Sequence, residues 1–218
     1  MTIPAHYRKP PRASSRQLAN ALAQAGREFH ARGWALGTSG NFSAVLQREP
    51  LLLLITSSGL DKAALNAQHF LEIDGACNVL RGSLRPSAEA PLHLAVARVR
   101  GTGAILHTHS VWGTLLSDFH ADKGGLVISG YEMLKGLEGV RTHEHSEWLP
   151  IVENAQDIPA LAASIEAVLL SHPDSHGFLL RAHGLYTWGD DVAQARRHVE
   201  VLEFLLEVLG RRESGKVG

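Results

Sequence analysis

A short apolar run that ends in two histidines, at residues 103–110, constrains the fold most. Gly-Ala-Ile-Leu at residues 103–106 predicts a buried strand, which must lie inside a sheet. Side chains two positions apart on a strand point the same way, so His107 and His109 should project together at its carboxyl end. Two imidazoles that face one point are half of a transition-metal site. The remaining ligands must then come from elsewhere in the sequence.

His183 is the candidate for the third ligand. It follows a second apolar run at residues 177–180, and we expect that strand to continue through residues 184–188. Three neutral imidazoles with one open position are typical of a catalytic zinc rather than a structural one. The alternative is chance, because the chain has 13 histidines and a single histidine in a strand is usually a core or surface residue.

Helical and strand patterns alternate along the rest of the chain, and no repeat or linker separates them. Apolar spacing predicts helices from Ser14 or Ser15 to Gly33 and over residues 89–99, 111–118 and 190–209, with one more that has Pro159 in its first turn. Strands are expected near residues 42–46, 51–56, 70–73 and 78–80. This pattern predicts an α/β fold with a central mixed, largely antiparallel sheet flanked by helices.

Composition limits the classes of function. A length of 218 residues fits one domain, and we divide the chain into an arm at 1–13, a single catalytic domain at 14–210 and a tail at 211–218. The net charge of −1 argues against nucleic-acid and membrane partners. Cys77, the one cysteine, excludes an intrachain disulfide and favours the cytoplasm. No apolar run is long enough to span a bilayer.

Three polar turns are candidates for a phosphate cradle. Glycine lets the backbone approach an anion, and hydroxyls, amides and helix N-termini donate hydrogen bonds to it. A lysine after the second turn would add a positive charge. Each turn alone is more typical of an ordinary turn or helix cap. The candidate residues are Ser39, Gly40 and Asn41, then Ser57, Ser58 and Gly59 with Lys62, and finally Ser87.

Glu89 and Glu132 are candidate acid/base groups, because a carboxylate beside a zinc ion can move a proton to or from a substrate. Either glutamate could instead be a solvated helix residue. His143 and His145 form a second His-x-His pair, which we interpret as a loop pair because no apolar strand leads into it.

Taken in order, these residues resemble the class II aldolase/adducin family over about residues 15–210. The resemblance implies a three-layer α/β/α fold, one zinc ion per chain on three histidines, a small sugar-phosphate substrate and a cyclic homotetramer with sites between subunits. Aldolases of the family often have two serines before the glutamate, and Ala88 stands in place of the second one here. The matching residues are Ser39-Gly40-Asn41, Ser58-Gly59, Ser87 with Glu89, His107 with His109, and His183-Gly184.

Within the family, residues 131–136, 150–154 and 181–189 are most similar to the branch that dehydrates a methylthio-substituted ketose phosphate in methionine salvage. This implies a hydro-lyase in which Glu132 is the main acid/base and Glu89 a second one. Rival interpretations are an aldolase of the fuculose-phosphate type and a ribulose-phosphate 4-epimerase. An adducin-like assembly module without catalysis is the alternative outside enzymes, but it predicts loss of the metal histidines, which are all present.

Overall fold

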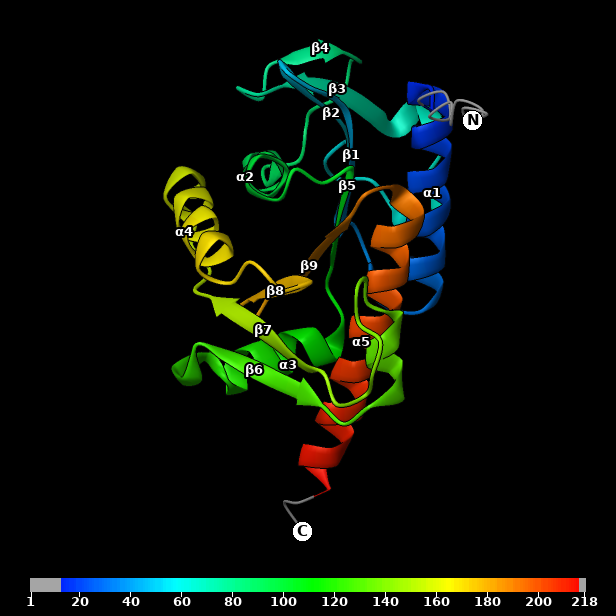
Figure 1. Cartoon of the computed structure of the whole chain (residues 1–218). Helices are drawn as coiled ribbons and strands as arrows, with labels where there is room; N and C mark the ends of the chain where they lie inside the picture. Colours follow the sequence, from blue (N-terminus) through cyan, green and yellow to red (C-terminus); the bar gives the residue numbers. More distant parts are fainter. Residues whose placement is uncertain (1–12, 216–218) are drawn as a thin grey trace, which may run out of the picture.

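The protein is built around one nine-stranded sheet, with the strands in the order β4-β3-β2-β1-β5-β9-β8-β7-β6 (Figure 1). This computed structural model describes residues 13–215, so the expected N-terminal arm lies almost entirely outside the described residues. Of the strand pairs described, β7 with β8 is parallel and the others are antiparallel, which confirms the mixed, largely antiparallel sheet. The strands are β1 Asn41–Arg48, β2 Leu51–Thr56, β3 Phe70–Asp74, β4 Val79–Arg81, β5 Ala104–Thr108, β6 Gly125–Ser129, β7 Ser146–Val152, β8 Gly177–Leu180 and β9 Gly184–Gly189.

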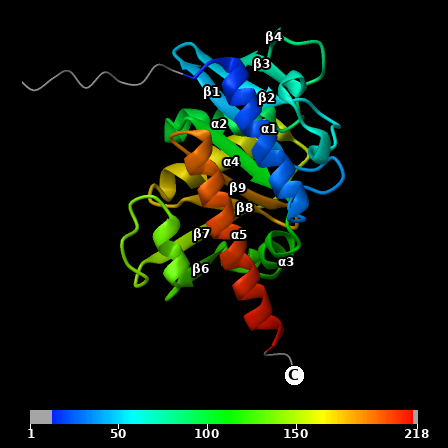
Figure 2. The ribbon, with the colours of Figure 1, turned by 90° about the vertical axis from the view of Figure 1, so that its right-hand side faces the viewer.

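Helices cover both faces of the sheet, which confirms the three-layer α/β/α architecture (Figures 1 and 2). On one face, α2 packs against α4, and together they bury apolar residues against the sheet. On the other face lie α1 and α5, and α3 packs against α5. The five helices are α1 Ser15–Ala31, α2 Ala90–Arg100, α3 Val111–Phe119, α4 Ile158–Ser171 and α5 Val192–Ser214. None of the helices within residues 13–215 is long and apolar enough to cross a membrane.

The helices begin where the sequence provides caps. Ser14 accepts a hydrogen bond from the backbone of Gln17, whose side chain accepts one from the Ser14 backbone, so α1 starts with a capping box. Asp191 caps α5 in a similar way by accepting from the Gln194 backbone. These local signals fix the helix starts, and burial of the apolar faces fixes how the helices lie on the sheet.

The expected single strand through His183 was wrong. Residues 177–189 form a tight antiparallel hairpin in which Leu180 pairs with Gly184, and His183 lies in the turn between β8 and β9. Ala182 in this turn has a φ of 50°, a left-handed conformation. Gly184 is required here, since a Cβ atom would lie 2.0 Å from the Thr108 carbonyl oxygen of the neighbouring strand β5. The hairpin therefore brings its turn against the end of β5.

The sequence patterns did not predict β6, β7 or the short 3-10 helix η4, Glu132–Gly136, that lies between them. The other expected strands and helices are present, with ends that differ by a few residues. In particular, α5 extends to Ser214, beyond the expected end at Leu209.

Candidate metal centre

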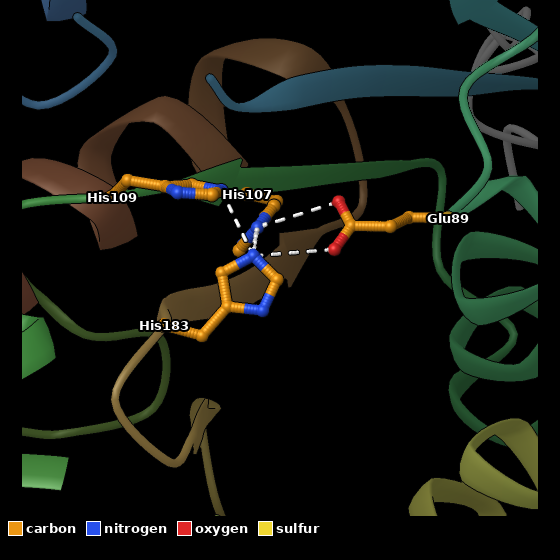
Figure 3. A group of neighbouring side chains, drawn as sticks. All are labelled: Glu89, His107, His109 and His183. Atoms are coloured by element: carbon orange, nitrogen blue, oxygen red, sulfur yellow. Dashed lines mark hydrogen bonds and ion pairs between the residues drawn. The ribbon is translucent and has the colours of Figure 1, made fainter. Parts of the chain in front are cut away.

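Three histidine side chains meet at the carboxyl end of β5, as the sequence predicted (Figure 3). His107 is near the end of β5 and His109 directly follows it, while His183 comes from the β8–β9 turn. The Nε2 atom of His183 lies 3.4 Å from that of His107 and 3.1 Å from that of His109. Three ring nitrogens from two distant segments thus face one point.

The surroundings of His107 and His109 favour the neutral imidazole, which is the form that can bind a metal ion. Nδ1 of His107 donates to the Leu185 carbonyl oxygen at 2.9 Å, which leaves its Nε2 as the lone-pair atom. Burial lowers the pKa of His107 well below its usual value, and the nearby His109 and His183 lower it further. Burial, with smaller effects from His183 and Lys62, lowers the pKa of His109 to about 4. Neutral imidazole is the form that binds a metal ion.

The donor set fits a zinc ion. Ligand atoms about 2.0–2.1 Å from a tetrahedral zinc lie about 3.3–3.4 Å from one another, close to the separations of the facing Nε2 atoms. Lone pairs that face each other at this distance repel unless a cation or proton lies between them. Glu89 adds a carboxylate oxygen to the group, and one ligand atom from each of the four residues lies within 4.8 Å of the others.

Glu89 faces the histidines from the start of α2 (Figure 3). It is the N-cap residue of that helix, but its side chain makes no capping hydrogen bond and is therefore free to turn toward the site. Its two carboxylate oxygens lie 3.5 Å from Nε2 of His107 and 3.3 Å from Nε2 of His183. The Asn41 amide donates to the oxygen on the His107 side at 2.5 Å. Glu89 can thus serve as a metal ligand or as a proton carrier beside the metal.

A cavity of about 340 Å³ opens beside these side chains. Its wall contains every residue of the expected phosphate cradle, together with Glu89, His109 and His183, whereas His107 is fully buried behind it. Apart from Thr38 and Ala88, the remaining wall comes from the β7–α4 connection and the first turns of α4. The cradle residues on the wall are Ser39, Gly40, Asn41, Ser57, Ser58, Gly59, Lys62 and Ser87.

Two details of the cradle suit an anion. The buried Ser57 hydroxyl has no hydrogen-bond partner among the described residues, so it is available to a ligand. The Lys62 ammonium donates to the carbonyl oxygens of Thr38 and Leu60, each at 2.9 Å, and burial lowers its pKa to about 8 against the opposing charge of Asp61. Lys62 is therefore mostly charged at neutral pH and has one further N–H to donate.

Backbone contacts hold the cradle turns together. Ser58 N–H donates to the Arg85 carbonyl oxygen at 2.9 Å, which ties the second turn to the strand-like segment before Ser87. Gly40 has a φ of 78°, and a Cβ atom there would lie 2.9 Å from the His107 carbonyl oxygen. The first turn can therefore approach β5 closely only with glycine at this position.

Glu132 lies apart from the histidines of its own chain. Its side chain, in η4, is 69% exposed and pairs with Lys135 and with His143, whose Nδ1 is 3.2 Å away. A hydrogen bond from Lys135, against a small desolvation effect, lowers the pKa of Glu132. Within residues 13–215, Glu132 belongs neither to the histidine cluster nor to the cavity wall.

The second His-x-His pair does not converge on one point, as expected for a loop pair. His143 pairs with Glu132, whereas Nε2 of His145 lies 2.8 Å from the buried Glu147 carboxylate. His176, which the sequence analysis did not single out, approaches the same carboxylate through Nδ1 at 2.9 Å and donates through Nε2 to the Glu138 carbonyl oxygen. Both His176 nitrogens are thus used in hydrogen bonds, and a buried ion-pair network is the simplest account of this group.

Comparison with known proteins decides the family. The family described as "Class II Aldolase and Adducin N-terminal domain" matches residues 20–209. The chain belongs to this family. The matched residues therefore include the three clustered histidines, Glu89 and every residue of the candidate cradle.

Similar sequences include a methylthioribulose-1-phosphate dehydratase of Yersinia enterocolitica, 46% identical over 177 residues, which are 81% of this chain and 83% of that protein. The enzyme of the same name from Sorangium cellulosum is 42% identical over 197 residues, or 89% of this chain and 92% of the relative. These matches extend over nearly the whole length of both partners.

Solved structures confirm the fold. YgbL from Klebsiella pneumoniae superposes with a TM-score of 0.76 at 26% identity, covering 91% of each chain. An L-fuculose 1-phosphate aldolase gives a TM-score of 0.72 at 22% identity, over 93% of this chain and 88% of that one. At such identity the second likeness concerns the fold alone.

Proposed function

We propose that this protein is a methylthioribulose-1-phosphate dehydratase of methionine salvage, which removes water from the phosphorylated ketose to give 5-methylthio-2,3-dioxopentyl phosphate. The observation that carries the proposal is the 40–46% identity to dehydratases of this name over 81–89% of the chain. The cavity supports it, because a phosphate cradle and a metal donor set share one wall.

In this proposal the cradle binds the phosphate and so orients the sugar. Ser57, whose hydroxyl has no partner among the described residues, and Lys62 donate to phosphate oxygens. His107, His109 and His183 would hold one zinc ion per chain. When bound, zinc supplies Lewis-acid polarisation of the substrate carbonyl, which makes the neighbouring C–H bond more acidic.

The protons and bonds of the reaction balance without a redox cofactor. A base takes the proton from carbon 3, and hydroxide leaves carbon 4 with a proton from a general acid, so that one water is released. The resulting enol carries its double bond between carbons 3 and 4. It becomes the 2,3-diketone when a proton is added at carbon 4 and lost from the carbon 3 hydroxyl.

Glu132 is our choice for the main acid/base, with Glu89 as a second one. Glu132 is exposed and apart from its own chain's cluster, so we propose that it reaches the cavity of a neighbouring copy in a homotetramer. An exposed apolar stripe on α3 offers a surface for such assembly: Val111, Leu115 and Phe119. We further propose one catalytic domain over residues 14–210 that works in the cytoplasm.

Product mass tests the proposal. Zinc-loaded protein is incubated with methylthioribulose 1-phosphate, and a product lighter by one water is expected. Cleavage into two fragments would indicate an aldolase, and an isomer of unchanged mass would indicate an epimerase. Either result would overturn the dehydratase assignment.

A further inference from the structure

A chain of buried hydrogen bonds leads from the core to Glu89. Ser43 and Asn41 lie on β1 with one residue between them, so their side chains share a face of the sheet. His93, on α2, faces them and its side chain is completely buried. Nδ1 of His93 lies 2.8 Å from the Ser43 hydroxyl, and its Nε2 makes a short contact with Oδ1 of Asn41.

The donor and acceptor of each hydrogen bond in this chain can be assigned by starting at Glu89. An ionised carboxylate only accepts, so Asn41 must present its amide N–H to Glu89 and its oxygen to His93. His93 must then carry its proton on Nε2, and the lone pair on Nδ1 accepts from the Ser43 hydroxyl. No other arrangement satisfies all four groups.

We infer that Ser43, His93 and Asn41 form a positioning chain that holds the Glu89 carboxylate in one orientation against the three-histidine metal site. Asn41 binds the oxygen near His107, and the other oxygen faces His183 at 3.3 Å. Without Asn41 held in place, Glu89 would lose the amide hydrogen bond that fixes its oxygen near His107.

The surroundings of His93 fit this role. Burial lowers the pKa of His93 to about 3, so the ring stays neutral and keeps one donor and one acceptor. The edge of its ring packs against Tyr186 at 5.7 Å between centroids, and Tyr186 in turn stacks on His107 at 3.9 Å. His93 does not line the cavity, so it influences the site only through its neighbours.

His93→Phe tests the inference, because it keeps an aromatic ring and removes both nitrogens. Because the Glu89 carboxylate is one of the four side chains that could ligate the metal in the substrate-free site, we expect zinc affinity, measured by competition with a chromophoric chelator, to fall about 10–100-fold, the usual effect of removing a group that orients a metal ligand. The visible absorption of the cobalt-loaded protein should change as well. His93→Gln, which can still donate to Asn41, should restore most of both properties.

The control is Thr102→Val. Thr102 lies just before β5, at the end of that strand opposite the histidines, and is buried like His93. Its hydroxyl donates to the Gly189 carbonyl oxygen, so Thr102→Val reports the cost of losing one buried hydrogen bond away from the site. The inference is overturned if His93→Phe has the same zinc affinity and cobalt spectrum as Thr102→Val. If His93→Phe does not fold, Asn41→Asp is measured instead, because aspartate has the same size as asparagine but no N–H to donate to Glu89. Unchanged zinc affinity and an unchanged cobalt spectrum in this variant would overturn the inference.

The turnover of His93→Phe is a second measurement, which rests on the proposed function. With methylthioribulose 1-phosphate, His93→Phe should lower kcat by about 10–100-fold and leave KM within about twofold. A rise in KM alone would contradict a role in orienting Glu89. If the unaltered protein fails to turn over this substrate, the proposed function fails, while the metal measurements still decide whether the positioning chain exists.

Discussion

At the scale of single residues, His107 is the most constrained member of the histidine cluster. It is fully buried, its Nδ1 is bound by the Leu185 carbonyl oxygen, and its ring stacks on Tyr186. We expect His107→Ala to lower the zinc content from about one ion per chain to nearly none, because two imidazoles bind zinc weakly. Metal analysis of the purified variant gives the answer. His145→Ala is the control and should retain its zinc.

Ser57 offers a test of the phosphate cradle. Its buried hydroxyl has no partner within the described residues, so Ser57→Ala removes an unsatisfied polar group and should not lower the melting temperature. The same change should raise KM with little effect on kcat, because the phosphate does not react. If the KM of this variant is unchanged, Ser57 does not bind the phosphate.

The two glutamates can be separated by conservative substitution. Glu132→Gln keeps the size of the side chain and removes the base, so kcat should fall by about 10²–10⁴, the usual contribution of a general acid or base. Zinc content should stay unchanged, since Glu132 lies outside the cluster. If Glu89→Gln abolished turnover while Glu132→Gln stayed near the unaltered rate, the main acid/base would be Glu89.

The histidine cluster could be predicted because its members follow simple rules. Alternation along a strand places His107 and His109 on one side, and their rings do meet, with 4.5 Å between centroids. The role of His93 could not be predicted in this way. It lies near the start of α2 and reaches the site only through its side-chain hydrogen bonds to Ser43 and Asn41 on β1, long-range contacts that no local pattern contains.

At the scale of elements, two errors have physical causes. Residues 177–189 were expected as one strand because apolar residues lie on both sides of 181–183, and that turn contains neither glycine nor proline. Ala182 adopts the left-handed conformation that such residues normally signal. The strand β7 was missed because Pro150 and the charged Glu147 interrupt its apolar pattern, although both are buried.

Glu147 makes β7 sensitive to pH. Burial opposes its charge, but the hydrogen bond and charge of His176, helped by His145, outweigh burial and lower the pKa of Glu147 from 4.5. Burial likewise opposes charge on His176, but Glu147 raises its pKa above 6.5 despite the nearby Arg100. The stabilisation from the Glu147–His176 pair is therefore lost as the pH falls through the lowered pKa of Glu147. It is also lost as the pH rises through the raised pKa of His176.

We expect Glu147→Gln to lower the free energy of unfolding by about 1.5–3 kcal/mol, as for hydrogen bonds to charged groups. The loss should be greatest between pH 4.5 and 6.5, the two ordinary pKa values, and smaller on either side. Urea unfolding across this pH range measures it. Glu72→Gln, which affects only a partly exposed pair with Arg81, is the control. A loss that is equal at every pH would contradict the charged pair.

At the scale of the whole molecule, one chain brings together the histidine cluster and the candidate cradle but keeps Glu132 away from both. The η4 segment that carries Glu132 is nevertheless firmly attached. The Glu138 carboxylate, just after η4, accepts from Arg197 at 2.8 Å and from Gln194 at 2.9 Å on α5. Such anchoring suits a group that must be presented at a fixed place on the surface.

Complementation between inactive variants tests whether Glu132 acts on a neighbouring copy. His107→Ala chains lack the metal site but have Glu132, and Glu132→Gln chains have the reverse. When the two are co-expressed in equal amounts, a site that draws its metal group from one copy and Glu132 from the next is complete in about a quarter of random cyclic neighbours. The mixture should therefore recover about a quarter of the unaltered activity per chain, since each neighbouring pair assembles independently. Differently tagged chains confirm that mixed oligomers form. If the mixture is then as inactive as its two components, Glu132 does not act on the metal site of a neighbouring copy.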